Sequence, residues 1–82
     1  MAFSDTWIFA SGGENLQQIF DYDGSNHVIY QGWSQPGQAT SAATWRIRKL
    51  TYSGDNVTNI QFPSGSPAFA YVWDNRVSYT YA

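Results

Sequence analysis

The stretch WRIRKLTYSGDNVTNIQF, residues 45–62, decides the fold of this 82-residue chain, because it has the pattern of a β-hairpin. Two runs of strand-forming residues flank the turn-forming sequence SGDN at 53–56. With a four-residue loop there, Tyr52 faces Val57 and Arg48 faces Gln61. Side chains alternate between the two faces of a strand. The hairpin therefore predicts a core face made by four apolar side chains: Trp45, Ile47, Ile60 and Phe62.

The opposite face of this hairpin carries Arg46 and Arg48, and the same pairing adds Asn59 and Gln61 to it. Three of the four basic residues of the chain lie in this stretch. An arginine pair on an exposed strand is ordinarily a solvated surface, and the sharper hypothesis is that it binds an acidic or polar partner surface bidentately. Lys49 falls on the apolar face near the turn, where its stem can cover Ile60 while its ammonium group reaches water.

The rest of the chain repeats the all-β pattern of short strand-forming runs separated by turn residues. We expect a single domain, 1–82, with an all-β fold: a small antiparallel sandwich or barrel built on two hairpins. Its segments are an N-terminal strand or arm at 1–14, with TWIFA (6–10) as its strand, a hairpin at 15–33 with its turn at Asp23 to Asn26, a small-residue linker at 34–43, the hairpin at 45–62, and a C-terminal turn and strand at 67–82.

The C-terminal segment is ambiguous between helix and strand. Ser66 and Pro67 form a helix-start signal, with serine at the N-cap and proline at the first helical position. As a strand, the segment would instead line Phe69, Tyr71 and Trp73 along one side. The sequence favours a short helical turn at about 67–73, followed by a terminal strand at 77–81.

The residues that carry catalysis and metal binding are scarce. The chain has no cysteine and a single histidine, His27, so neither a disulfide framework nor a structural zinc site is expected. Next to a turn, His27 is interpreted as a solvated residue at a strand start rather than part of a nucleophile system. Asp21 and Asp23 have a spacing open to acid–base pairing or Ca²⁺, but Asp23-Gly24 is typical turn chemistry. We predict no enzyme, no metal and no cofactor.

Charge and composition indicate the class of partner. The net charge is −2 and charged residues make up only 12% of the chain, which argues against nucleic acid as a partner. No membrane or signal segment is evident, so we predict synthesis in a cytoplasm and no membrane partner. The polar residues are mainly amides and hydroxyls, and the chain has 4 Trp, 6 Tyr and 5 Phe. Such a surface suits proteins or sugars, and so small a core favours self-association.

Three stretches resemble small proteins encoded among the virion genes of tailed bacteriophages: YDGSNHVIYQG, QPGQATSAATWRIRKLTYSGDNVTNIQF and FAYVWDNRVSYTY. The resemblance runs from about Phe20 to Tyr81, and PGQATSAATWRIRKLTY and VWDNRVSYTY are its most specific parts. It implies a virion structural component, present in many copies and in contact with other phage proteins. It brings no catalytic residues.

The function predicted is therefore that of a non-enzymatic bacteriophage virion structural protein acting through protein–protein association. Head decoration or cementing is slightly favoured over neck, tail or fibre attachment, and the expected partners are other virion proteins and further copies of the chain. The alternative is a small carbohydrate-binding module for host-surface recognition, with Trp33 stacking on a sugar ring. The candidate partner-binding residues are Arg46, Arg48, Gln61 and Trp33.

Overall fold

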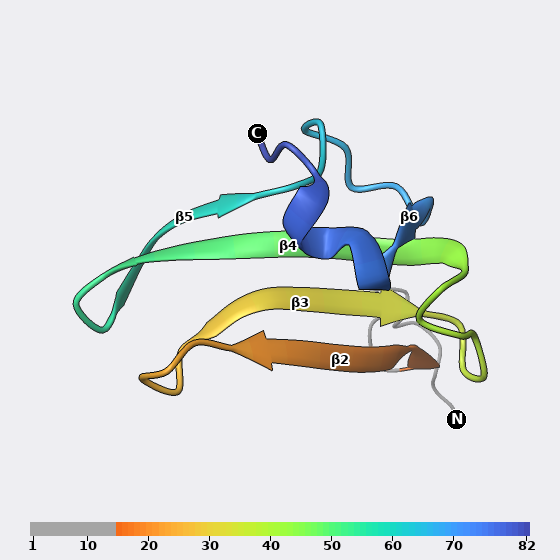
Figure 1. Ribbon diagram of the computed structural model, residues 1–82, viewed down its shortest axis with the longest axis horizontal. Coiled ribbons are helices and arrows are strands. Elements are labelled where there is room, and N and C mark those ends of the chain that lie inside the picture. Colours follow the sequence, from red (N-terminus) through yellow and green to blue (C-terminus); the bar gives the residue numbers. More distant parts are fainter. Residues whose placement is uncertain (1–14) are drawn as a thin grey trace, which may run out of the picture.

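The computed structural model describes residues 15–82, which form a mostly β structure around one antiparallel sheet (Figure 1). Its strands are β2 (Gln17–Tyr22), β3 (Val28–Ser34), β4 (Ala43–Ser53), β5 (Asn56–Gln61) and the two-residue β6 (Tyr71–Val72). The first four form a meander in sequence order, and β6 pairs with the start of β4. A 3-10 helix, η2 (Trp73–Ser78), follows β6 directly.

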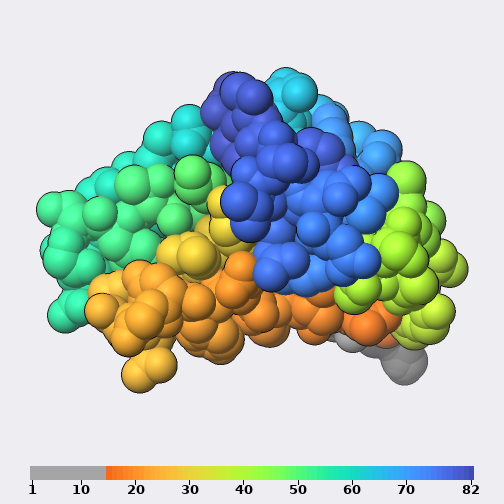
Figure 2. Space-filling view, in the orientation of Figure 1, coloured from red at the N-terminus to blue at the C-terminus, as the bar shows by residue number. Residues whose placement is uncertain are grey.

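The all-β prediction is confirmed. The predicted second layer of strands, which would make a sandwich or a closed barrel, is wrong. The sheet is not closed, and no second sheet packs on it within residues 15–82. One face is instead covered by the short C-terminal segment that contains β6 and η2 (Figures 1 and 2). The predicted strand at 6–10 lies outside the described residues.

The first hairpin is confirmed, with its turn where the sequence places it. β2 and β3 pair antiparallel on either side of the turn. The Asp23 carboxylate accepts hydrogen bonds from the backbone N–H groups of Ser25 and His27, at 2.7 and 3.0 Å. Asn26 has a φ of 65°, a left-handed conformation that asparagine tolerates better than most residues. Turn chemistry therefore explains the Asp23–Gly24 sequence.

The second hairpin forms as predicted, but its register differs beyond the turn. Ser53 pairs with Asn56, so the connecting loop is shorter than the four residues expected. Gly54 supports this tight turn with a φ of +60°. Tyr52 lies opposite Val57, as predicted, because this pair is the same with either loop.

A β-bulge in β5 changes the pairing of the remaining residues. Thr58 has no residue opposite it, so Leu50 pairs with Ile60 and Lys49 pairs with Gln61. Ile60 is therefore not on the core face, and it remains 42% exposed. Gln61 lies opposite Lys49 rather than Arg48, which corrects the face assigned to it from the sequence.

The C-terminal prediction is wrong in position. The helical turn begins at Trp73 rather than at 67, and the predicted terminal strand is reduced to a single bridge between Pro63 and Tyr81. Ser66 does accept a hydrogen bond from the backbone N–H of Ala68, but no helix follows. Val72 is instead extended and pairs with Ala43, because β6 joins the sheet through β4.

The linker between the hairpins accepts hydrogen bonds from Trp45 and from Asp74, which lie outside it. The Nε1–H group of Trp45 donates to the carbonyl oxygen of Ala39 at 2.9 Å. The backbone N–H of Asp74 donates to the carbonyl oxygen of Thr40 at 3.2 Å. The first bond satisfies the polar atom of a fully buried indole. The second ties the start of η2 to the linker.

The core lies between the sheet and the C-terminal segment. Trp45 and Ile47 are fully buried on β4, and Tyr30 and Trp73 are buried beside them. The rings of Trp45 and Trp73 are 6.3 Å apart between centroids. Five partly buried apolar residues complete the cluster: Ile19, Ile29, Tyr71, Tyr79 and Tyr81. Lys49 lies on this face as predicted, but its ammonium group is 5.8 Å from the Tyr81 ring centroid.

Gly32 is the position on β3 where the Trp73 indole approaches the sheet. A Cβ atom at this residue would lie 2.7 and 2.8 Å from two carbons of the Trp73 ring, and 3.3 Å from the Trp45 ring. Real Cβ atoms do not approach aromatic carbons this closely, so the packing requires glycine.

Arg76 holds η2 onto the sheet from the side. Its Nε donates to the Asp21 carboxylate on β2 at 2.9 Å, and its guanidinium carbon lies 4.6 Å from the Trp73 ring centroid. The Tyr81 hydroxyl donates to the carbonyl oxygen of Arg76 at 2.8 Å, and burial raises the pKa of that phenol. Tyr81 is thus linked through Arg76 to β2, which forms one edge of the sheet.

We expect Gly32→Ala to lower the free energy of unfolding by about 1–3 kcal/mol, because the added methyl group would displace Trp73. Urea denaturation followed by tryptophan fluorescence measures the loss. Gly24→Ala is the matched control, since nothing lies within 4 Å of a Cβ at that turn residue. Equal stability of the two variants would show that Trp73 does not pack as described.

Candidate functional site

The face of the sheet opposite η2, termed the open face, is not covered by any element of residues 15–82. Alternation along the paired strands assigns the side chains to this face. They are Gln18, Phe20 and Tyr22 on β2, Gln31 and Trp33 on β3, Arg46, Arg48 and Leu50 on β4, and Ile60 on β5. Burial follows the same alternation, most clearly on β2, where these three residues are the exposed ones.

Trp33 lies near the end of β3 on the open face, in contact with two arginines of β4. It pairs directly with Arg46 across the β3–β4 ladder, and Arg48 is the next residue of β4 on the same side. Both guanidinium carbons lie 5.2 Å from the Trp33 ring centroid. Arg46 also lies 5.3 Å from the ring of Phe62. These are cation–π distances, so the aromatic rings hold both guanidinium groups in place.

A chain of side-chain hydrogen bonds extends from Arg48 across three strands. The Nε of Arg48 donates to Gln31 Oε1 at 2.9 Å, and Gln31 Nε2 donates to Gln18 Oε1 at 3.2 Å. The Nε of Arg46 is buried and has no hydrogen-bond partner within residues 15–82. Arg48 is therefore fixed by stacking and hydrogen bonding, and Arg46 by stacking alone.

The open face is positively charged although the chain as a whole is negative. Within the described part of the chain, neither Arg46 nor Arg48 forms an ion pair. Asp21 is paired with Arg76, and Asp23 and Asp55 both contact His27. The structure thus separates this arginine pair from the carboxylates of residues 15–82.

The structure brings together three of the four residues proposed from the sequence. Trp33, Arg46 and Arg48 are in contact on the open face, whereas Gln61 pairs with Lys49 and belongs to the covered side. Trp33 lies in β3. Sequence reasoning missed Gln31, the hydrogen-bond partner of Arg48, although alternation with Trp33 along β3 was a signal for it.

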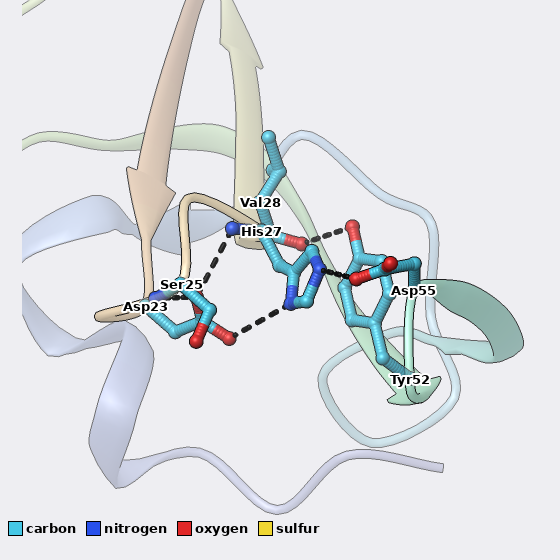
Figure 3. Close-up of polar contacts among 6 residues, drawn as sticks. All are labelled: Asp23, Ser25, His27, Val28, Tyr52 and Asp55. Atoms are coloured by element: carbon cyan, nitrogen blue, oxygen red, sulfur yellow. Dashed lines mark hydrogen bonds and ion pairs between the residues drawn. The ribbon is translucent and has the colours of Figure 1, made fainter.

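A second polar cluster lies at the tips of the two hairpins, around His27 (Figure 3). Its Nε2 lies 2.8 Å from Asp55 in the second turn, and its Nδ1 lies 3.3 Å from Asp23 in the first. The ring stacks on Tyr52 at 4.6 Å, and the Tyr52 hydroxyl donates to the carbonyl oxygen of Val28 at 2.9 Å. His27 lies directly before β3, at a strand start as predicted, but its side chain is only 21% exposed and joins the two turns.

The contacts within this cluster shift the pKa values of His27 and Asp23 toward their charged forms. The hydrogen bond with Asp55 raises the pKa of His27, and the charge of Asp23 acts in the same direction. The backbone N–H groups of His27 and Ser25 lower the pKa of Asp23. The folded chain thus favours the protonated form of His27 and the ionised form of Asp23 more than the unfolded chain does.

Residues 15–82 lack two features that would indicate other kinds of site, a metal-binding cluster and a membrane-spanning helix. No group of three or more His, Asp or Glu side chains there is arranged to hold a metal ion. None of the helical segments in that part of the chain has the length and apolar character to span a membrane. Comparison of the chain with protein families, with curated proteins and with solved structures found no match.

We expect the His27 cluster to make stability depend on pH. Because the folded pKa of His27 is raised, its contribution is complete below the unfolded value of about 6.5 and is lost as pH rises through the folded pKa. The lowered pKa of Asp23 adds stability above about pH 3.8, which is lost as pH falls through the folded value. The cluster therefore stabilises the fold most between about pH 4 and 6.5.

Thermal unfolding of the protein and of His27→Gln, measured from about pH 5 to 8, tests this expectation. The decline in melting temperature above pH 6.5 should be weaker in the variant than in the protein. Asp55→Asn should reduce the same decline, because it removes the largest cause of the shift. Parallel pH profiles for all three would contradict it.

Proposed function

We propose that this chain is a non-enzymatic virion structural protein of a tailed bacteriophage that acts through protein–protein association, with the open face as its contact surface. The observation that carries the proposal is the cluster of Trp33, Arg46 and Arg48 on a face that the described residues leave uncovered. The resemblance of three stretches to phage virion proteins supports the setting. Head decoration or cementing is favoured over neck, tail or fibre attachment.

Tryptophan and arginine are the side chains that protein interfaces favour at their energetic centres. Here they are ordered before any partner arrives, because Trp33 stacks with both guanidinium groups and Gln31 accepts a hydrogen bond from Arg48. Binding then costs less side-chain entropy than it would with free arginines. The cluster has the composition and the preorganisation of an interface centre.

Apolar side chains surround this centre. Phe20 is 46% exposed, Tyr22 is 55% exposed, and Ile60 lies on the far side of the arginines. A partner that covers them removes apolar surface from water, worth roughly 25 cal/mol for each Å². Exposed apolar groups gathered on one face are typical of interaction surfaces. A chain with so small a core gains stability from such contacts, whether with other virion proteins or with further copies of itself.

Carbohydrate binding is the alternative function, and one observation favours it. The amides of Gln18 and Gln31 lie next to Phe20 on the open face, and amides beside an exposed aromatic ring suit sugar hydroxyls and a sugar ring. Trp33 is less suited to this role than its type suggests, because two guanidinium groups already lie near its ring. A stacked sugar would have to displace at least one of them.

Particle composition tests the virion assignment. In purified particles of the phage that encodes the chain, we expect mass spectrometry to detect it in many copies and labelled antibody to place it at the head. Particles that lack the chain would contradict the proposal.

Substitution tests the open face itself. We expect Trp33→Ala, and the pair Arg46→Gln with Arg48→Gln, to reduce the copies bound per particle at least about tenfold. Lys49→Gln, on the covered side, is the matched control and should incorporate normally. Normal incorporation of the open-face variants would exclude this face. Binding on a glycan array that Trp33→Ala or Phe20→Ala abolishes would favour the carbohydrate alternative.

A further inference from the structure

We propose that Arg46 and Arg48 bind an extended segment of another virion protein in which two carboxylates stand two residues apart. This inference rests on the proposed function, and it adds the chemistry of the partner. The two arginines stand two residues apart on one strand and one face, which separates their Cα atoms by about 6.8 Å. An extended acidic–any–acidic sequence presents its carboxylates at the same spacing.

The guanidinium groups of Arg46 and Arg48 have hydrogen-bond donors that no residue of 15–82 uses. Each carries five N–H donors, and within residues 15–82 the only hydrogen bond from either is that of Arg48 Nε to Gln31. The terminal nitrogens of both arginines therefore make no hydrogen bond to those residues. A carboxylate accepts two parallel hydrogen bonds from a guanidinium edge, and this pairing is stronger and more directional than one with a neutral acceptor.

Leu50 and Ile60, which lie beside the two arginines, extend the partner sequence that this face would recognise by one further side chain. Leu50 is the next residue of β4 on the open face after Arg48, and Ile60 pairs with it from β5. A partner segment running along β4 would place its next inward-facing side chain over these two residues. The recognised pattern is then two acidic residues and one apolar residue at alternate positions.

The partner is not a second copy of this chain. Asp21 and Asp23 are the only acidic residues of the sequence that stand two apart. Asp21 is bonded to Arg76 on the covered face, and Asp23 holds its own turn and contacts His27. Both carboxylates are thus engaged within their own copy. Contacts between copies of the chain therefore use interactions other than this pairing of arginines with two carboxylates.

Charge favours a protein segment over nucleic acid. The open face offers two cations on a chain whose net charge is −2, which matches two carboxylates better than a long run of phosphates. The Trp33 ring, which would have to stack on a base, is already in contact with the two guanidinium groups.

Fluorescence anisotropy with labelled synthetic peptides tests the inference on the full chain. The probe is Thr-Glu-Thr-Glu-Thr-Val-Thr, and the matched control peptide has glutamine in place of each glutamate. We expect the acidic peptide to bind at least about tenfold more tightly than the control, and less tightly as salt is raised. The double variant Arg46→Gln with Arg48→Gln should lose this preference, whereas Lys49→Gln should keep it.

Several outcomes would overturn the inference. They are equal binding of the two peptides, an unchanged preference in a double variant whose melting temperature and circular dichroism match those of the protein, and tighter binding of single-stranded oligothymidine than of the acidic peptide. Loss of particle incorporation in the open-face variants together with no acidic-peptide binding would leave the proposed function standing and remove this inference alone. Normal incorporation of those variants would instead exclude the open face as the contact surface, and this inference with it.

Discussion

The contact between the Trp73 indole and Gly32 is the constraint on which the rest of the structure depends. A short C-terminal segment can cover one face of the sheet only if a large ring lies directly on the backbone, and β3 supplies the space by having no side chain at that point. Trp73 then meets Trp45, and the same placement brings Arg76 to Asp21. The contact of Trp73 with Gly32 thus positions the core, the helix η2 and the ion pair between Arg76 and Asp21.

Covering the sheet on one face only also separates two kinds of aromatic residue. Those on the covered face form the core with Trp45 and Trp73, and the hydroxyls of Tyr79 and Tyr81 bond to the backbone there. On the open face, Trp33 takes no part in this core and contacts two guanidinium groups. Elsewhere in residues 15–82, Asp21 is paired with Arg76, and Asp23 and Asp55 are paired with His27. Within residues 15–82, Arg46 and Arg48 have no carboxylate partner, and we propose that a partner protein supplies one.

Local patterns predicted what local interactions determine. Period-two alternation placed Arg46 and Arg48 together and Trp45 with Ile47 in the core, and the Asp23–Gly24 sequence placed the first turn. Two of the errors involve residues distant in the chain. The pairing of Val72 with Ala43 overrode the helix signal at Ser66, and His27 found its partner Asp55 in the other turn. The bulge at Thr58, which moved Ile60 and Gln61 to the opposite faces from those predicted, leaves no mark on the hydrophobic pattern.

That bulge also bears on aggregation. β5 is the last strand of the meander, it contains neither a charged residue nor proline, and such an edge is a template for unwanted strand pairing. A bulge twists the edge and interrupts the row of backbone groups that an incoming strand would need. Just beyond β5, Phe62 exchanges two backbone hydrogen bonds with Ala82, so the chain end covers that part of the edge. The sheet is thereby protected against growth at its β5 edge.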